Sequence, residues 1–295
     1  MPRISYVNGQ YVPYNDACVH IEDRGYQFAD GIYEVIGCIH GKLADETGHL
    51  DRMERSLSEM QMDMPVPRRI LQFILREVLR RNKLKNANLY IQVTRGRARR
   101  DFKFPAPETP QSLVVIANPF KFDDSPTIQS GVRVITLPDI RWKRRDIKTI
   151  ALLPQCLAKQ KAIDSGVYDA WMVDPDGFVT ECSASNAWIV TKDRKLVTRS
   201  VSNDILRGVT RTAIQHLCRE MNLTIEERAF TPEEAYDAIE AFASSATALI
   251  TPVIEIDGHK IGDGKPGDVT RNIYAEYRAY ADGLKGEQVH WEPGF

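Results

Sequence analysis

The pattern of apolar and polar residues in the first third of the chain predicts short strands joined by tight turns. Asn8-Gly9 lies between two apolar pairs, an arrangement typical of a two-residue hairpin. Residues 31–36 run toward His40-Gly41-Lys42, where a second hairpin turn is expected. Two further strands are predicted at 88–94 and 112–117, separated by a basic loop that contains proline.

Apolar residues recur at helical spacing in several longer segments. One of them, from about 67 to 81, is predicted to be a helix with apolar residues on one face. This face consists of Ile70, Phe73, Ile74 and Val78. Another helix, capped by Asn203 or Asp204, is predicted to run to about Asn222. Further helices are predicted at about 49–62 and 153–164, after the capping box Thr231-Pro232-Glu233-Glu234, and from about Asp268.

A stretch rich in turn-forming residues follows the strand at 112–117. We interpret part of it as a linker, which divides the chain into a first domain at 1–120, the linker at 121–130 and a second domain at 131–295. A hairpin centred on Asp174-Pro175-Asp176-Gly177 is expected in the second domain. Strands and helices mix without strict alternation, so the predicted fold class is α+β in two domains rather than a doubly wound parallel sheet.

Composition excludes several classes of protein. The 295 residues are 43% hydrophobic and 27% charged, which is ordinary globular usage and excludes bulk disorder. The longest aliphatic run, Leu113–Ala117, is far shorter than the roughly 20 residues of a membrane helix. Lys and Arg number 39 and Asp and Glu number 40, and the net charge of −1 weighs against nucleic acid as a partner. We therefore expect a soluble enzyme or binding protein.

The cysteines indicate a reducing compartment. They are scattered, odd in number and include no C-x-x-C pair, so we interpret them as unpaired thiols and predict a cytoplasmic protein. The six histidines occur singly, and no metal site is predicted. The cysteines are Cys18, Cys38, Cys156, Cys182 and Cys218.

Two basic clusters and one lysine are the first candidates for chemistry. The clusters, at 95–100 and 141–145, are compatible with nucleic-acid binding, a solvated loop or a pocket for a small anion. Lys148 precedes the apolar stretch 150–153. Apolar neighbours reduce the hydration of a lysine amine and favour its use as a nucleophile. A lysine at the surface with its stem along apolar residues has the same pattern. Two small-residue segments, 208–210 and 244–247, suit either simple turns or a phosphate site.

Several motifs occur together in one order along the chain. They are Phe28–Glu34, His49–Arg52, Gln92–Gly96, Asp146–Lys148, Thr180–Asn186, Ile205–Arg211, Ser244–Thr247 and Thr251–Val253. In this combination the chain resembles the fold-type IV pyridoxal-phosphate transaminases, and within them the D-amino acid transaminases. The resemblance covers almost the whole chain and implies the two-domain α+β fold of that family.

The resemblance implies a role for each matching residue. Lys148 forms the Schiff base with pyridoxal 5'-phosphate and then moves a proton between substrate and cofactor. Glu181 pairs with the ring nitrogen of the cofactor and keeps it protonated. Arg52 binds the phosphate by charge-assisted hydrogen bonds. The other implied cofactor contacts are Leu206 against the ring and Val209, Thr210, Ser245 and Ala246 around the phosphate.

Substrate recognition departs from the family pattern. Tyr33 and Arg100 fall on two positions that hold the substrate carboxylate in D-amino acid transaminases, but Phe102 stands where a histidine is expected. We interpret Phe102 as a packing side chain, and Arg97 or Arg99 as alternative carboxylate ligands. The implied reaction is ping-pong transamination between a D-amino acid such as D-alanine and 2-oxoglutarate or pyruvate. The alternatives are an (R)-selective amine:pyruvate transaminase, a branched-chain L-amino acid transaminase and an aminodeoxychorismate lyase.

The resemblance also implies partners. Members of the family are homodimers, and the basic loop with Arg100 is expected to be supplied across the dimer interface. An active site between the two domains is expected, with Arg52 and Tyr33 from the first and Lys148 and Glu181 from the second. A cofactor-free binding protein on the same scaffold is the alternative class of function. No nucleic acid or membrane is expected as a partner.

Overall fold

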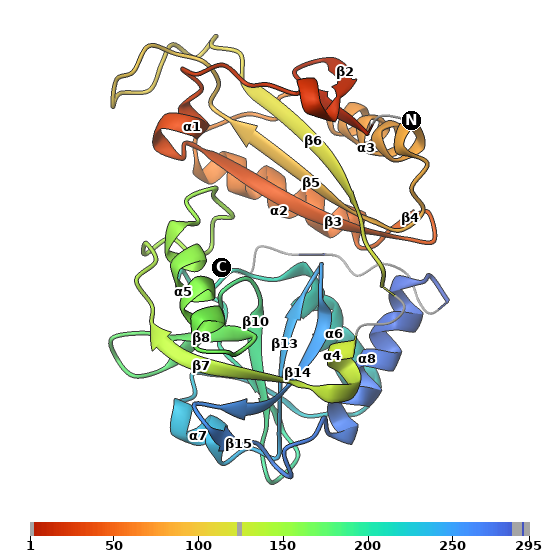
Figure 1. Cartoon of the computed structure of the whole chain (residues 1–295), viewed down its shortest axis with the longest axis vertical. Coiled ribbons are helices and arrows are strands. Elements are labelled where there is room, and N and C mark those ends of the chain that lie inside the picture. The colour runs from red at the N-terminus through yellow and green to blue at the C-terminus, as the bar shows by residue number, and fades with distance from the viewer. Residues whose placement is uncertain (1–2, 123–125, 285–290, 292–295) are drawn as a thin grey trace. The chain divides into compact units, whose positions relative to one another are not determined.

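A computed structural model describes residues 3–122, 126–284 and 291 of the chain (Figure 1). Its contacts divide it into two units, and each is described by itself. The first unit contains residues 3–122, the segment Ile147–Ala151 and Trp291. The second contains residues 126–146 and 152–284. We call Ile147–Ala151 the lysine segment.

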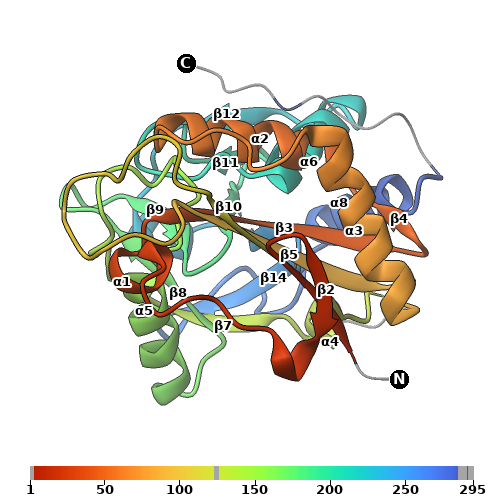
Figure 2. The same cartoon turned by 90° about the horizontal axis from the view of Figure 1, so that it is seen from above.

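The first unit is built on an antiparallel sheet with strand order β2-β1-β6-β5-β3-β4. The strands are β1 (Ile4–Val7), β2 (Gln10–Pro13), β3 (Gly31–Ile39), β4 (Lys42–Leu43), β5 (Ala87–Thr94) and β6 (Ser112–Pro119). The helical elements are η1 (Tyr14–Asp16), α1 (Arg24–Phe28), α2 (Glu46–Glu59) and α3 (Arg68–Asn82). The two long helices lie on one face of the sheet (Figure 2), and the apolar core of the unit lies beneath them.

Both predicted hairpins of the first unit are confirmed. At the first turn Asn8 and Gly9 have φ angles of 46° and 94°. At the second turn His40 and Gly41 have φ angles of 50° and 84°. Positive φ at both central residues matches the right-handed twist of the flanking strands, which is why asparagine and glycine predict the first turn well.

The second unit contains a mixed sheet with strand order β12-β11-β10-β13-β14-β7-β8-β9, and β15 pairs with β14. The strands are β7 (Val132–Pro138), β8 (Asp169–Val173), β9 (Val179–Cys182), β10 (Asn186–Val190), β11 (Leu196–Thr198), β12 (Ile225–Glu227), β13 (Glu240–Ser245), β14 (Leu249–Ile256) and β15 (His259–Lys260). The helices are α4 (Pro126–Ser130), α5 (Leu153–Asp164), α6 (Val209–Glu220), α7 (Pro232–Tyr236) and α8 (Asp268–Ala281).

The second sheet curves back on itself. Strand β9 ends the strand order, yet only the turn Ser183–Ser185 separates it along the chain from β10, near the other end. The two strands contact each other, so the polar residues at the end of β9 and the start of β10 lie together. Both units mix helices with sheet, and the expected α+β class is confirmed. Within the described ranges, no helix has both the length and the apolarity needed to span a membrane.

Two helices show details that the sequence pattern does not give. The buried face of α3 consists of Leu71, Ile74, Leu75, Val78 and Leu79. Ile70 and Phe73, which the sequence places on the same face as Ile74 and Val78, are 40% and 61% exposed. The segment carries two overlapping apolar stripes, and the wider aliphatic one faces the core. Helix α6 begins at Val209 rather than near 204, because the preceding residues make polar contacts that a helix would break.

Candidate active site

The lysine segment extends the first sheet beside β3. The Tyr33 N–H donates to the Lys148 carbonyl at 2.9 Å, and the Ile150 N–H donates to the Gly31 carbonyl at 3.1 Å. Ile147 is buried in the core of the first unit. The prediction that the second domain carries Lys148 therefore differs from the structure, because burial of Ile147 and pairing with β3 hold the lysine against the first sheet.

The Lys148 amine lies over an aromatic ring. Its Nζ is 4.3 Å from the centroid of the Tyr33 ring, and Tyr33 stacks on Tyr90 with centroids 5.7 Å apart. The Lys148 N–H lies 3.4 Å from the hydroxyl of Ser56, a buried residue of α2. Two predicted site residues, Lys148 and Tyr33, are thus in direct contact, and the backbone of the lysine is fixed on both sides.

Arg52 on α2 is held by a buried carboxylate. Its Nε and Nη2 donate to Glu34 Oε2 and Oε1 at 2.9 and 2.6 Å. His49 Nδ1 lies 3.0 Å from the same Oε1. Burial by itself raises the pKa of Glu34, but the Arg52 guanidinium and His49 outweigh it and hold that pKa well below its usual range. Glu34 is therefore an anion that fixes the orientation of Arg52.

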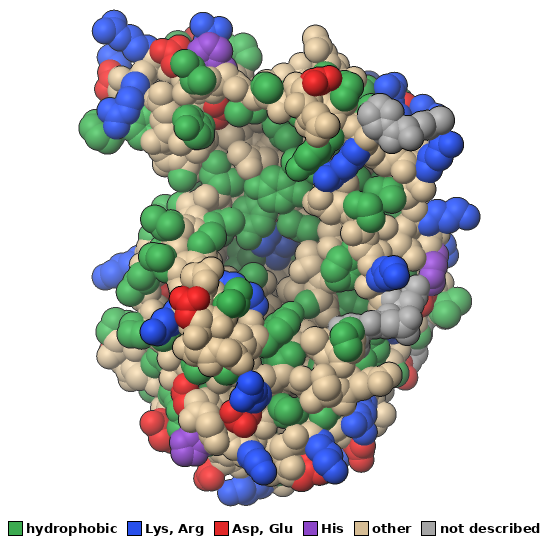
Figure 3. All heavy atoms as spheres, viewed as in Figure 1, with side chains coloured by type: hydrophobic (Ala, Val, Ile, Leu, Met, Phe, Trp, Pro, Cys, Tyr) green, Lys and Arg blue, Asp and Glu red, His purple; other side chains and the backbone are tan. Residues whose placement is uncertain are grey.

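The loop between β5 and β6, residues 95–111, presents Arg100 at the surface. The base of the loop is anchored, since Arg95 pairs with buried Asp30 at 2.9 Å. The Arg100 guanidinium lies 5.1 Å from the centroid of the Phe28 ring. Figure 3 shows basic and apolar side chains where Figure 1 draws this loop. The exposed residues of the loop include Arg97, Arg99, Arg100 and Phe102, so all three arginines are accessible to a carboxylate.

Phe102, at the position of the expected histidine, is a surface residue. Its ring is 82% exposed, and its centroid lies 5.7 Å from that of Phe28. Phe102 therefore packs against the ring of Phe28 in α1, at the surface of the molecule and not in the core. Phe102 has no hydrogen-bonding side chain, so it leaves carboxylate binding to its neighbours.

Glu181 on β9 is buried, and three donors meet its carboxylate. Arg141 Nη1 donates to Oε2 at 2.5 Å, Asn186 Nδ2 donates to Oε1 at 2.8 Å, and the Leu206 N–H donates to Oε1 at 3.0 Å. Burial raises the pKa of Glu181 against the lowering effect of Arg141. The carboxylate is thereby fixed in position, with both oxygens engaged.

Asn186, the first residue of β10, connects Glu181 to two further predicted site segments. Its Nδ2 also donates to the Leu206 carbonyl at 3.0 Å. In the sheet, Asn186 pairs with Ser244 on β13. These contacts gather Glu181, Leu206 and the end of β13 around one side chain.

The N-terminus of α6 lies next to Asn186 and suits an anion. Gly208 is the N-cap, with φ of −66° and ψ of 134°, and no side chain of the described residues caps the helix there. The first amides of a helix have no acceptor within it, so they are available to a phosphate. Helix α6 packs on β13, whose end leads into the turn of Ser245 and Ala246. Val209 and Thr210 at the start of α6 are buried.

A Gly208→Ala substitution tests how tightly this corner is packed. A Cβ at position 208 would lie 2.2 Å from Asn186 Oδ1, so Asn186 must shift and loosen its hold on Glu181. We expect the free energy of unfolding to fall by about 1–3 kcal/mol, measured by urea denaturation without added cofactor. In an Asn186→Ala background the same substitution should cost much less. If Gly208→Ala lowers the free energy of unfolding equally in both backgrounds, the added Cβ does not clash with Asn186.

Sequence reasoning missed two groups of residues at the site. The basic cluster 141–145 is not simply a solvated loop, because the side chains of Arg141 and Arg145 are 6% and 8% exposed and pair with Asp139. The aspartate just before the cluster was the available signal. Glu34 was the second omission, and its signal was a lone carboxylate in an otherwise apolar strand.

Comparisons with known proteins establish the family. The model of the amino-transferase class IV family matches residues 31–256. A D-alanine aminotransferase from Staphylococcus haemolyticus is 38% identical over 279 residues, which cover 94% of this chain and 97% of that protein. One from Bacillus licheniformis is 39% identical over 266 residues, covering 90% and 93%. The chain belongs to the class IV aminotransferases.

Solved structures share the fold of this class IV aminotransferase. The branched-chain amino acid aminotransferase of Escherichia coli has a TM-score of 0.90 at 23% identity, covering 99% of this chain and 98% of that one. The branched-chain aminotransferase of Thermoproteus uzoniensis has a TM-score of 0.84 at 25% identity, covering 96% and 95%. Class IV aminotransferases use pyridoxal 5'-phosphate, so the family and cofactor expected from the sequence are confirmed.

Proposed function

We propose that this aminotransferase moves amino groups between a D-amino acid, such as D-alanine, and a 2-oxo acid, such as 2-oxoglutarate or pyruvate. The observation that carries the proposal is the 36–39% identity to D-alanine aminotransferases over most of the chain. The branched-chain enzymes of the same fold are only 22–25% identical. Tyr33 and Arg100 also stand at the positions that the sequence resemblance assigns to the substrate carboxylate.

Residues of the first unit suit two parts of pyridoxal 5'-phosphate. Arg52 would bind the phosphate, and the Glu34 anion would keep its guanidinium in one orientation. The Lys148 Nζ would bind the cofactor aldehyde. When bound, the cofactor supplies an electron sink for the carbon of the donor that loses its proton.

Residues of the second unit suit the ring and the phosphate. The Glu181 carboxylate would accept a hydrogen bond from the protonated ring nitrogen, and Leu206 would pack on the ring face. The amides of Val209 and Thr210 at the α6 N-terminus would bind the phosphate. The turn of Ser245 and Ala246 would add the Ser245 hydroxyl, which already accepts from the Ala248 N–H at 3.1 Å.

Lys148 would perform the proton transfer. With an amino donor bound, the Lys148 Nζ would accept the proton from the donor Cα and would hold it for the return step. The Tyr33 ring beneath Nζ restricts where this amine can move. One amine thus serves as nucleophile in one step and as general base in the next.

A panel of amino donors tests the proposal. The holoenzyme would be assayed with D-alanine, D-glutamate, L-leucine and (R)-1-phenylethylamine, each with 2-oxoglutarate and with pyruvate. We expect the highest kcat/KM with the D-amino acids. The exposed Phe102 at the expected histidine position favours the amine as the rival donor. A clear preference for (R)-1-phenylethylamine would replace the proposed function with that of an (R)-selective amine transaminase.

Arg100→Ala should separate carboxylate binding from catalysis. Loss of a charged hydrogen bond of about 1.5–3 kcal/mol predicts a rise in KM for D-alanine of roughly 10- to 100-fold. The KM for (R)-1-phenylethylamine, which has no carboxylate, should change little. Arg97→Ala and Arg99→Ala are matched controls on the same exposed loop. If either of these raises the KM for D-alanine more than Arg100→Ala does, that arginine is the carboxylate ligand.

We also propose that the protein is a homodimer. Exposed apolar side chains gather where residues 19–28 lie beside the loop 95–111, as the hydrogen bond between the Arg24 N–H and the Gly96 carbonyl shows. The apolar side chains there are Ile21, Tyr26, Phe102 and Phe104. A second copy covering them would remove this surface from water. Sedimentation should give twice the chain mass of 33.5 kDa, and a monomer at micromolar concentration would contradict the proposal.

The proposed compartment is the cytoplasm. All five cysteines are free in the structure. Unpaired thiols are kept reduced in that compartment, whereas secreted chains of this kind usually form disulfides.

A further inference from the structure

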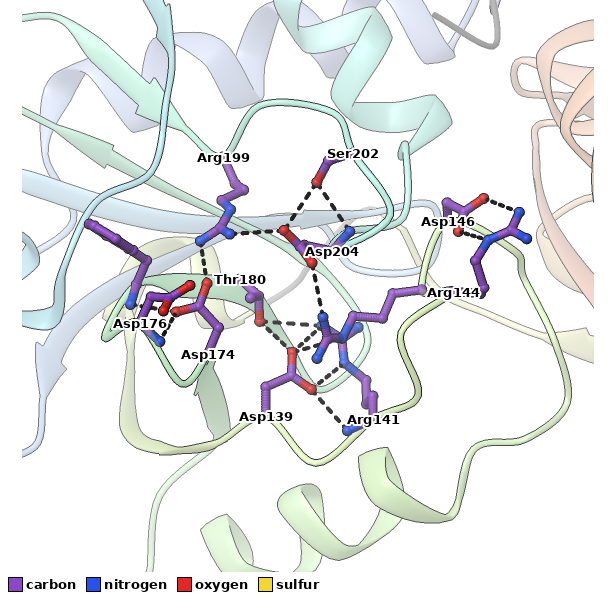
Figure 4. A network of polar contacts seen from close by, with 12 residues as sticks. Asp139, Arg141, Arg144, Asp146, Asp174, Asp176, Thr180, Arg199, Ser202 and Asp204 are labelled. Carbon is purple, nitrogen blue, oxygen red and sulfur yellow. Dashed lines mark hydrogen bonds and ion pairs between the residues drawn. The ribbon is translucent and has the colours of Figure 1, made fainter. Parts of the chain in front are cut away.

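Charged side chains of the second unit form a continuous series of alternating sign that ends at Glu181. Arg141 pairs with Glu181 at 2.5 Å and with Asp139 at 2.7 Å. Arg145 pairs with Asp139 at 3.2 Å and with Asp204 at 3.3 Å. Figure 4 labels five members of the series, namely Arg141, Asp139, Asp204, Arg199 and Asp174. In order, this charge chain consists of Glu181, Arg141, Asp139, Arg145, Asp204, Arg199 and Asp174.

Asp139 is the centre of the buried part of the charge chain. Its side chain is 0% exposed. It accepts two hydrogen bonds from the Arg141 guanidinium, from Nε at 3.0 Å and from Nη2 at 2.7 Å, and a third from the Arg141 backbone N–H at 3.1 Å. It also accepts from the Thr180 hydroxyl at 2.7 Å. Burial raises the pKa of Asp139, but Arg141 and Thr180 outweigh it, and the pKa is lowered overall. Asp139 is therefore a charged and fully bonded carboxylate.

The sharing of Arg141 leaves Glu181 incompletely neutralised. Two N–H positions of the guanidinium are bound to Asp139, and Nη1 donates to Glu181. The charge chain as a whole contains four carboxylates and three guanidiniums, so one negative charge is in excess. Asp204, in the middle of the second half of the charge chain, is 44% exposed and screened by solvent, whereas the two end carboxylates, Glu181 and Asp174, are 6% and 7% exposed. A cation beside Glu181 would therefore balance the negative charge that the shared Arg141 does not neutralise.

We infer that Asp139 is a positioning residue for the ring-nitrogen site: by holding Arg141 through two hydrogen bonds it keeps Glu181 fixed and negative enough to bind a cationic ring nitrogen. The inference rests on the proposed function, since it takes Glu181 as the partner of that nitrogen. Asp139 acts through Arg141 and does not itself touch the cofactor. Without it, Arg141 is free to neutralise Glu181 fully, and the cationic ring nitrogen loses its counter-charge.

The test compares two cofactors on the purified protein after the bound cofactor has been removed. Pyridoxal 5'-phosphate has a ring nitrogen, and its 1-deaza analogue has C–H in that place. Dissociation constants for both are measured by quenching of tryptophan fluorescence. We expect the wild type to prefer pyridoxal 5'-phosphate, and Asp139→Asn to reduce that preference roughly tenfold, equivalent to about one pKa unit, with the affinity for the analogue nearly unchanged.

Two further sets of variants keep the test decisive if Asp139→Asn folds poorly. Thr180→Val removes the hydroxyl that donates to Asp139 at nearly constant shape, and should reduce the preference in the same direction. Thr180→Ser keeps the hydroxyl and should leave the preference intact. Asp237→Asn, in an exposed pair with Lys192, is the matched surface control.

The outcomes separate this inference from the proposed function. Equal weakening of both cofactors in Asp139→Asn and Thr180→Val would show a merely structural role and overturn the inference alone. An undiminished preference in these variants would do the same. If the wild type binds pyridoxal 5'-phosphate and its 1-deaza analogue with equal affinity, Glu181 is not the partner of the ring nitrogen, and that part of the proposed function is wrong as well.

Discussion

Lys148→Ala is expected to lower kcat for transamination by at least about 10²–10⁴-fold, the usual contribution of a positioned general base. The variant has no amine to accept the donor proton. It also cannot bind the cofactor aldehyde, so the loss should lie toward the upper end of that range. Formation of pyruvate from D-alanine, followed by a coupled assay, measures the change. The absorbance of the bound cofactor should shift in the same variant.

Lys159→Ala is the matched control for this prediction. Lys159 on α5 also places its Nζ over a tyrosine ring, 4.2 Å from the centroid of Tyr168, but no motif of the family includes it. This variant should keep kcat near the wild-type value. If Lys148→Ala retains a kcat within tenfold of the wild type, Lys148 is not the base, whatever its contact with Tyr33.

Arg52→Ala is expected to destabilise the protein even without cofactor. Glu34 is 0% exposed, and after the guanidinium is lost it would keep the contact with His49 and the hydrogen bond from the Val35 N–H, but no arginine to balance its charge. Breaking a buried ion pair by removing one partner costs about 3–5 kcal/mol. Urea denaturation of the cofactor-free protein measures this loss. Adding Glu34→Gln to Arg52→Ala should recover part of the stability, because no buried charge then remains.

The cost of Arg52→Ala should depend on pH. In the wild type, the lowered pKa of Glu34 gives a stabilisation that is complete above the unfolded value, about 4.3, and is lost as pH falls through the folded value. Without Arg52, burial dominates and the folded pKa of Glu34 rises above the unfolded value. The penalty of the variant is then largest at pH 7 and shrinks on acidification toward pH 4. A penalty independent of pH would mean that Glu34 is not its source.

Local rules predicted those elements whose signals lie within a few residues. Helix α5 has the predicted bounds, Leu153–Asp164, because a proline at its start and a glycine after its end mark both termini. The hairpin turn at Asn8-Gly9 is set by the φ angles of two residues. The buried face of α3 could not be chosen in this way, because two apolar stripes overlap and only the packing against the sheet selects one of them.

The site was predicted unevenly for a similar reason. The motifs indicated Lys148, Glu181 and Arg52 by resemblance, but the residues that hold them come from distant parts of the chain. Arg141 and Glu181 are 40 positions apart, and the Ser56 hydroxyl that meets the Lys148 N–H is 92 positions away. The sequence of a basic cluster does not indicate which acidic residues, distant in the chain, will form ion pairs with its arginines. Pairings of this kind depend on the folded topology rather than on any local pattern.

The two hydrogen bonds of the Asn186 amide limit which substitutions the protein can tolerate during evolution. One small side chain supports both Glu181 and the segment that leads into α6, so a substitution there alters two parts of the proposed cofactor site at once. The side chains of Arg100 and Phe102 do not support two parts of the molecule in this way, because both lie at the surface of their loop, beside the ring of Phe28. If Arg100 binds the donor carboxylate as proposed, single substitutions in that loop should change the preferred amino donor while leaving the residues around Glu181 unchanged.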